Sequence, residues 1–173
     1  MKTKLLELPV ATADGRFIAH YSEKGLAELN FPNGRAELPL GPAARQRRPA
    51  KENFVPAKIR AWHRTTEAAL KKILAGNEPK KFPPLDLAGT AFQKSVWNAL
   101  RKISLGKTKS YGEIAQAIGR PKAVRAVGGA CGANPVPVLV PCHRVLAANK
   151  KLGGFSGGLD WKRSLLKREG IKF

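Results

Sequence analysis

The chain of 173 residues is long enough for one full domain or two small ones with a buried core. It shows neither an apolar run that could span a membrane nor a signal-peptide pattern, and its two cysteines exclude a disulfide framework, so we expect a cytoplasmic protein with a free thiol. Its 32 Lys and Arg against 12 Asp and Glu give a formal net charge of +20, which predicts attraction to nucleic acid or to another anionic surface.

The N-terminal half has the pattern of a small antiparallel sheet followed by a helix. Apolar alternation between glycine-containing turns predicts three short strands, at Leu5–Val10, Arg16–Tyr21 and Leu26–Phe31. We expect His20 to lie on the surface of this sheet. Apolar spacing then predicts an amphipathic helix from Lys58 to Leu74.

Two proline-containing stretches divide the chain. Residues 41–58 are basic and poor in apolar side chains, which predicts a loop, and residues 77–85 are expected to connect two domains. We therefore expect an N-terminal domain at 1–85 and a second domain at 86–173. Both domains are basic, with net charges of +8 and +12, so either one can attract a polyanion.

The second domain is predicted to be mostly helical. Thr90 is placed to cap a helix that continues to Leu105. Ser110 followed by Glu113 has the spacing of a capping box and starts a short helix, and after a turn a further helix covers residues 123–133. Short helix, tight turn and helix form the helix-turn-helix plan. With a small sheet in the N-terminal domain and mainly helices in the second domain, the predicted fold class is α+β.

The helix predicted at residues 123–133 is rich in small residues: Ala123, Ala126, Gly128, Gly129, Ala130, Gly132 and Ala133. Because each glycine weakens a helix by roughly 1 kcal/mol, this composition indicates close approach to another surface. Packing against a neighbouring helix would explain it. The alternative is insertion into a narrow groove of nucleic acid, with Arg125 as the long reaching side chain.

Residues 134–145, with the sequence Asn-Pro-Val-Pro-Val-Leu-Val-Pro-Cys-His-Arg-Val, carry the strongest chemical signal. The β-branched residues and the three prolines predict a buried, extended and non-helical segment. It leads to Cys142, whose neighbours His143 and Arg144 are of the kind that favour a thiolate. The alternative is a small packed cysteine beside a surface histidine, which is the more common arrangement for a lone Cys-His pair, so both interpretations stay open at this point.

Three blocks, Asn-Pro-Val-Pro at 134–137, Pro-Cys-His-Arg-Val at 141–145 and Ser-Gly-Gly at 156–158, together resemble the O6-alkylguanine-DNA alkyltransferase family over residues 87–170. The resemblance implies repair of duplex DNA by irreversible transfer of the alkyl group from O6-alkylguanine to Cys142, once per protein molecule. The damaged nucleotide would first be flipped out of the duplex. O4-alkylthymine is a further candidate substrate.

The resemblance also assigns catalytic roles. Cys142 would accept the alkyl group, His143 would act as its base through a bridging water, and Glu169 would orient the histidine. Asn134 matches the residue that braces the turn before the cysteine. Tyr111 matches the residue that rotates the 3′ phosphate and donates to the guanine. Without the resemblance, Glu169 would be interpreted as a surface acid at the end of a helix.

The small-residue helix would, by the same resemblance, enter the minor groove, with Arg125 replacing the flipped nucleotide. The residues expected to contact DNA are Tyr111, Lys122, Ala123, Arg125, Ala126 and Gly128. The residues expected to form the substrate pocket are Pro137, Val145, Phe155, Ser156 and Gly157. Phe155 stands where many relatives have tyrosine, so a hydroxyl contact is lost there.

No cofactor is expected, because the sequence contains neither a phosphate loop nor a dinucleotide-binding turn. No metal is expected either, since residues 1–85 contain no cysteine and their histidines, His20 and His63, do not make a site. Cys131 is interpreted as a packed small hydrophobe. The expected partner is double-stranded DNA containing O6-alkylguanine, bound by a nucleoid-associated monomer.

Two other classes of function stay open at this point. A non-catalytic binder of alkyl lesions would resemble the same family, although such proteins lack the cysteine that this chain has at position 142. A helix-turn-helix regulator would bind DNA without any use for the cysteine segment. A cysteine peptidase is disfavoured by the charge of +20 and by the small-residue helix.

Overall fold

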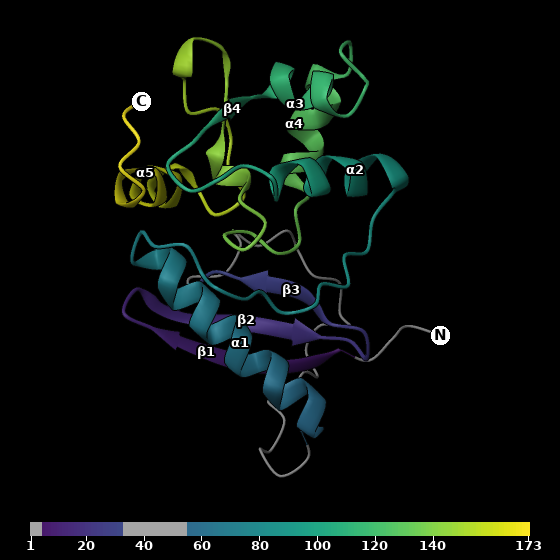
Figure 1. The fold of residues 1–173 in the computed structure, drawn as a ribbon, viewed down its shortest axis with the longest axis vertical. Coiled ribbons are helices and arrows are strands. Elements are labelled where there is room, and N and C mark those ends of the chain that lie inside the picture. Colours follow the sequence, from purple (N-terminus) through teal and green to yellow (C-terminus); the bar gives the residue numbers. More distant parts are fainter. Residues whose placement is uncertain (1–4, 33–54) are drawn as a thin grey trace, which may run out of the picture.

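The N-terminal part of the chain forms a three-stranded antiparallel sheet with the strand order β1-β2-β3 (Figure 1). The computed structural model describes residues 5–32 and 55–173. Each strand lies within two residues of its predicted bounds: β1 (Leu6–Thr12), β2 (Gly15–Tyr21) and β3 (Leu26–Asn30). The predicted sheet is therefore confirmed.

Helix α1 (Ala57–Leu74) lies across one face of this sheet, as Figure 1 shows, and begins one residue before its predicted start. Ile59, Leu70 and Ile73 on the inner side of the helix are buried in the core that the helix shares with the sheet. The loop predicted at 41–58 lies outside the described residues up to position 54, and its last two residues already belong to α1.

The expectation that His20 lies on the sheet surface is wrong, because this residue is only 3% exposed. Its Nε2 lies 3.1 Å from Nδ2 of Asn30, and its Nδ1 lies 4.0 Å from a carboxylate oxygen of Glu7. Polar side chains from β1 and β3 therefore flank the ring. Strand alternation assigns a residue to a face of the sheet but does not reveal what covers that face.

The connection between the sheet and the second half of the chain runs along β3. The amide of Leu26 donates to the carbonyl of Pro84 at 2.8 Å, and the amide of Asp86 donates to the carbonyl of Leu26 at 2.9 Å. Leu85 thereby forms a parallel bridge with Leu26. The predicted connection is thus held by the sheet, and a domain boundary at 85/86 stays a prediction.

Helices are the main regular elements of the second half of the chain, which lies beyond β3 (Figure 1). Its α-helices are α2 (Ala91–Leu100), α3 (Tyr111–Ala117), α4 (Val124–Gly132) and α5 (Leu159–Arg168). Two short parallel strands, β4 (Lys109–Ser110) and β5 (Val145–Leu146), pair with each other. Among the described residues, no helix is long and apolar enough to cross a membrane.

Both predicted helix caps are confirmed. The hydroxyl of Thr90 accepts from the amide of Gln93 at 3.2 Å, and the hydroxyl of Ser110 accepts from the amide of Glu113 at 3.1 Å. In each case the side chain of the third helical residue also accepts from the cap amide, which completes a capping box. After α3 the chain turns at Gly119, with φ of +70°, and α4 completes the predicted helix-turn-helix.

Helix α2 ends five residues before the predicted Leu105. The amide of Ile103 donates to the carbonyl of Leu100 in a turn, and the side chain of Ile103 is 7% exposed. The carbonyl of Ile103 accepts from Nη1 of Arg144 at 2.6 Å. The apolar spacing predicted a longer helix, since spacing along the chain carries no information about the contact with the distant Arg144.

Helix α4 packs inward through only part of its surface. The indole nitrogen of Trp97 donates to the carbonyl of Ala130 at 2.8 Å, and Cys131 is 6% exposed, so the predicted packing of Cys131 is confirmed. A Cβ built on Gly129 or on Gly132 would meet no atom of the described residues within 4 Å. Internal packing therefore does not explain these two glycines.

Candidate active site

The segment that leads to Cys142 is buried and non-helical, as predicted, but it is not extended. Its apolar side chains are at most 3% exposed: Val136, Val138, Leu139 and Val140. The amide of Val140 donates to the carbonyl of Val136 at 2.9 Å, and Val138 has φ of +72°, which is rare for a β-branched residue. The segment is therefore a tight, strained turn, after which Cys142 begins a single turn of 3₁₀ helix.

Asn134 accounts for the shape of this turn. Its fully buried side chain donates from Nδ2 to the carbonyl of Val140 at 2.8 Å and accepts at Oδ1 from the amide of Val136 at 3.1 Å. Nδ2 also donates to Sγ of Cys142 at 3.1 Å. One amide side chain therefore connects both ends of the turn to the thiol, which fits the predicted bracing role.

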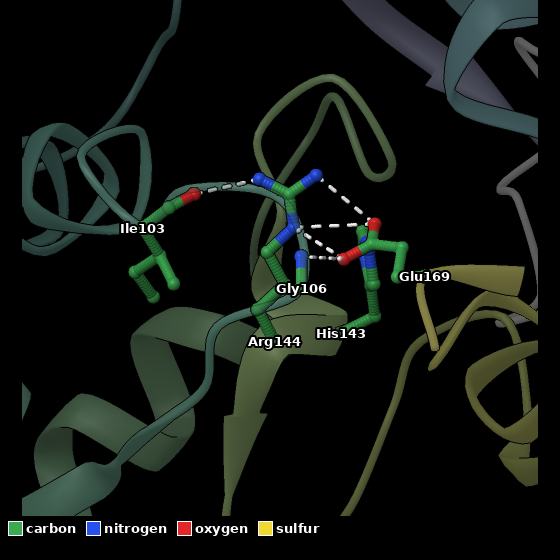
Figure 2. Close-up of polar contacts among 5 residues, drawn as sticks. All are labelled: Ile103, Gly106, His143, Arg144 and Glu169. Atoms are coloured by element: carbon green, nitrogen blue, oxygen red, sulfur yellow. Dashed lines mark hydrogen bonds and ion pairs between the residues drawn. The ribbon is translucent and has the colours of Figure 1, made fainter. Parts of the chain in front are cut away.

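His143 and Glu169 form the predicted pair (Figure 2). Nε2 of His143 lies 2.9 Å from Oε1 of Glu169, and neither side chain is more than 1% exposed. Glu169 follows directly after α5, so the end of this helix brings the carboxylate to the turn that begins at Cys142. This burial excludes the alternative that Glu169 is a surface acid.

Arg144 has a role different from the predicted one. Its Nε donates to Oε2 of Glu169 at 2.9 Å, its Nη2 donates to Oε1 at 3.0 Å, and its Nη1 donates to the carbonyl of Ile103 (Figure 2). The guanidinium charge is thus paired with Glu169. Arg144 fixes the carboxylate in place instead of directly favouring a thiolate at Cys142.

Burial and hydrogen bonding keep Glu169 ionised and His143 neutral. Burial would raise the pKa of Glu169, but hydrogen bonds and charges from His143 and Arg144 hold that pKa at about 2. Burial also lowers the pKa of His143, in opposition to the hydrogen bond and charge of Glu169. An ionised carboxylate can only accept hydrogen bonds, so Nε2 of His143 carries the proton. Nδ1, buried and without a hydrogen bond to any described residue, is then the basic nitrogen.

A cavity of about 540 Å³ adjoins Cys142. The predicted site residues that line it are Tyr111, Arg125, Gly128, Cys142, Phe155 and Ser156. They come from the start of α3, from α4, from the turn after the buried segment and from the loop before α5. The structure therefore brings together residues that are up to 45 positions apart between Tyr111 and Ser156.

Three predicted pocket residues do not line this cavity. Pro137 bridges to Val140 within the buried turn, and Val145 is fully buried in β5. Gly157 lies against Phe31, because a Cβ built on it would be 2.5 Å from the ring. Whether a residue lines the cavity or packs elsewhere depends on the tertiary structure, which the sequence does not reveal.

Most of the residues predicted to contact DNA lie in α4 or directly before it, and Tyr111 begins α3. Lys122, Arg125 and Ala126 are exposed, and Ala123 is half-buried at the N-cap. Val124 was not predicted to belong to this surface, yet it is 42% exposed and lines the cavity. The exposure of Val124, next to Arg125 and on the cavity, marks it as a further residue of this surface, and the sequence alone did not indicate that exposure.

Lys162 is a further residue of the site that the sequence reasoning missed. Its side chain is fully buried in α5, and Nζ donates to the carbonyls of Val145 at 2.7 Å, Gly154 at 3.3 Å and Leu152. Burial lowers the pKa of Lys162, whereas two nearby cysteines raise it. Lys162 therefore fastens β5 to the loop that lines the cavity and places an ammonium group near the thiol of Cys142.

The site as a whole can perform nucleophilic chemistry. It combines a buried thiol, a neutral imidazole that a carboxylate orients, and an adjoining cavity, which is a set suited to attack on an electrophilic carbon. Burial, with a contribution from two cysteines, raises the pKa of Tyr111, so its hydroxyl stays protonated and can donate. Within residues 5–32 and 55–173, no group of three or more His, Cys, Asp or Glu could hold a metal ion.

The comparisons with known proteins show which family the chain belongs to. A methylated-DNA–protein-cysteine methyltransferase from Methanosarcina acetivorans is 45% identical over 148 residues, which cover 86% of this chain and 87% of that protein. The chain belongs to this family. Residues 91–171 match the family model of the 6-O-methylguanine DNA methyltransferase, DNA binding domain. This matched range of the methyltransferase contains Cys142, His143, Glu169 and every cavity residue.

Solved structures of the family confirm the α+β fold. The crystal structure of the Mycobacterium tuberculosis O6-methylguanine methyltransferase is 35% identical, has a TM-score of 0.76, and the match covers 96% of this chain and 93% of that one. The structure described as the Mycobacterium tuberculosis protein in complex with DNA has a TM-score of 0.72 at 35% identity and covers 93% of this chain and 90% of that one. Both structural matches therefore cover the N-terminal sheet as well as the helical part of this methyltransferase.

Proposed function

We propose that this protein repairs double-stranded DNA by transferring the alkyl group of O6-alkylguanine to Sγ of Cys142. The observation that carries the proposal is the buried Cys142, next to the His143–Glu169 pair, on the wall of a cavity that also includes residues of α4. A thioether does not hydrolyse under mild conditions, so each molecule acts once. The same site is a candidate for O4-alkylthymine.

The proton of the Cys142 thiol would move to Nδ1 of His143 through a bridging water. Two features support this route: Nε2 is already engaged by the ionised Glu169, and Nδ1 makes no hydrogen bond with a described residue. The hydrogen bond from Asn134 to Sγ and the ammonium group of Lys162 both favour the thiolate that forms. Sulfur then attacks the alkyl carbon in line with the bond to O6.

The leaving group is guanine. The new S–C bond forms as the C–O6 bond breaks, and the electron pair of that bond stays on the base. Tyr111 is a donor in the cavity that can stabilise the developing charge. Guanine takes up one proton, which balances the proton lost by Cys142, so the transfer needs no cofactor.

DNA would bind along α4, and the damaged nucleotide would flip into the cavity. Support comes from Gly129 and Gly132, which face outward without a packing role, and from the exposed Arg125 at the edge of the cavity. Arg125 would occupy the space that the flipped nucleotide leaves. We infer that a monomer suffices, because one chain supplies the thiol, the base, the cavity and the groove helix.

The test is the stoichiometry of repair on duplex DNA that contains O6-methylguanine in excess over protein. Repair should stop after one lesion per protein molecule, and Cys142→Ala should bind the DNA without removing any lesion. A non-catalytic binder would hold the lesion and remove none. A regulator would bind methylated and unmethylated duplexes alike, and either result would reject the proposal.

A further inference from the structure

Phe31 is an aromatic residue of the N-terminal half that reaches the cavity wall. It follows β3 directly and is 4% exposed. Its ring centroid lies 4.9 Å from that of Trp161 in α5 and 5.8 Å from that of Phe155, with an interplanar angle of 72° to Phe155. Because Phe155 lines the cavity, Phe31 supports a residue of its wall from the outside.

The lid segment, which we define as residues 155–157, contacts the same ring at a second point. A Cβ on Gly157 would lie 2.5 Å from Cε2 of Phe31 and 2.8 Å from its Cζ, closer than real side chains approach. Only glycine lets the backbone of the lid segment lie this near the ring. A ring-to-ring contact and a backbone-to-ring contact thus fix the lid segment on Phe31.

The end of β3 also contacts the other side of the site. The amide of Leu29 donates to the carbonyl of Pro135 at 2.9 Å, in the segment that leads to Cys142. Phe155 extends the connection, since its ring centroid lies 6.4 Å from that of His143 at an angle of 83°. The end of β3 therefore contacts both the lid segment and the segment that leads to the thiol.

We propose that Phe31 is a positioning residue that sets the distance between the lid segment and Cys142, and with it the size of the alkyl group that the cavity accepts. This role presupposes the alkyl transfer proposed above and adds a determinant of substrate size. Phe31 lies outside residues 91–171, the range of the matched family model, so the N-terminal sheet takes part in substrate selection.

Phe31→Leu tests this role, because leucine is apolar but too short to support both Phe155 and Gly157. Phe17→Leu is the matched control: Phe17 is fully buried in the same sheet, and its ring contacts are Phe31 at 5.5 Å and Trp161 at 5.6 Å. The two variants lose the same atoms from the same core, so a general loss of stability is common to both. Melting temperatures measured on both variants check this equivalence.

The readout is the single-turnover rate of transfer from duplexes containing O6-methylguanine or O6-benzylguanine. With Phe31→Leu the lid segment recedes, methyl transfer slows and benzyl transfer is maintained, so the benzyl-to-methyl ratio should rise roughly tenfold over wild type. With Phe17→Leu the ratio should stay within about twofold of wild type.

A comparison of double variants makes the test independent of stability. Gly157→Ala places a Cβ against the Phe31 ring and should slow methyl transfer. Phe31→Leu removes the clashing atoms, so Gly157→Ala should cost little methyl transfer beyond that of Phe31→Leu itself, whereas in the Phe17→Leu background its full cost should remain. Such non-additivity is expected only of residues in contact.

Equal ratios in Phe31→Leu and Phe17→Leu, or an equal cost of Gly157→Ala in both backgrounds, would overturn the role of Phe31. If Phe31→Leu does not fold, Phe31→Met, which is flexible and closer in volume, replaces it in both comparisons. Wild-type protein that transfers neither alkyl group would reject the proposed function itself. Normal wild-type transfer with unchanged ratios would reject only the positioning role.

Discussion

At the scale of single residues, the important asymmetry is between the two nitrogens of His143. Nε2 faces an ionised carboxylate that Arg144 holds in place, and Nδ1 is left as the basic nitrogen. Glu169 therefore fixes the tautomer as well as the orientation of the ring. The thiol, in turn, is held by Asn134, so both partners of the proposed proton transfer have fixed positions.

This asymmetry predicts how alkyl transfer depends on pH. His143 must be neutral to accept a proton, and burial lowers its pKa below the ordinary value of about 6.5. Glu169 stays ionised down to a pKa of about 2. The rate of transfer from free O6-benzylguanine base should therefore decline on acidification with a midpoint below 6.5.

The measurement is a single-turnover pH profile on the free base, which excludes effects on DNA binding. His143→Gln, which cannot titrate, should react slowly and lose the acid-side decline. A midpoint at or above 6.5 in the wild type, or an unchanged decline in His143→Gln, would contradict the assignment of His143 as the base.

At the scale of elements, helix α4 contains glycines that lower its stability and that its packing within the protein does not require. A Cβ added to Gly129 or Gly132 would meet no described atom, although alanine would make a more stable helix by roughly 1 kcal/mol at each position. Close approach of a DNA groove explains this composition. Arg125, exposed on the same helix and lining the cavity, is then the side chain that fills the vacated stack.

Arg125→Ala should slow repair of a matched duplex by roughly ten- to a thousandfold, because extrusion of a base costs a few kcal/mol. The reaction with free O6-alkylguanine base needs no extrusion and should keep nearly its wild-type rate. A lesion opposite a mismatch should show an intermediate loss. Single-turnover transfer on the three substrates checks this.

Arg163→Ala is the matched control, since Arg163 lies on α5, is half exposed and pairs with Asp160. It should leave all three rates close to wild type. Equal slowing of Arg125→Ala on free base, mismatched duplex and matched duplex would show that Arg125 shapes the active site or the fold instead of acting as a wedge.

The elements differ in how far their sequence predicts them. Ser110 and Glu113 are three residues apart, and their capping box was predicted because both partners are local. The left-handed backbone conformation of Val138 was not predicted, because the turn that contains it depends on the side chain of Asn134. The early end of α2 was missed for the same kind of reason, a contact between Ile103 and a distant arginine.

For the site, the residues in the Pro-Cys-His-Arg-Val block were predictable from the resemblance, and Lys162 was not. A signal for it exists in the sequence: Lys162, Leu165, Leu166 and Glu169 follow the spacing i, i+3, i+4 and i+7 of one helix face. The leucines identify that face as buried, so a lysine and a glutamate on it require partners. Which partners they find depends on tertiary structure.

At the scale of the whole molecule, the net charge of +20 should make DNA binding depend strongly on salt. With about five phosphate contacts, the logarithm of affinity for duplex DNA should fall against the logarithm of salt concentration with a slope of roughly −4 to −5. Titrations at several salt concentrations with Cys142→Ala, which cannot react, measure this slope. A flat response would remove the basic surface from the account of DNA binding.

The most direct test of the central claim is the mass of the intact protein after incubation with duplex DNA that contains O6-methylguanine. Wild-type protein should gain one methyl group in place of one hydrogen, and peptide mapping should locate it on Cys142. Cys142→Ala should gain nothing while still binding the DNA. An unchanged wild-type mass, a methyl group on Cys131, or a gain that persists in Cys142→Ala would contradict alkyl transfer to Cys142.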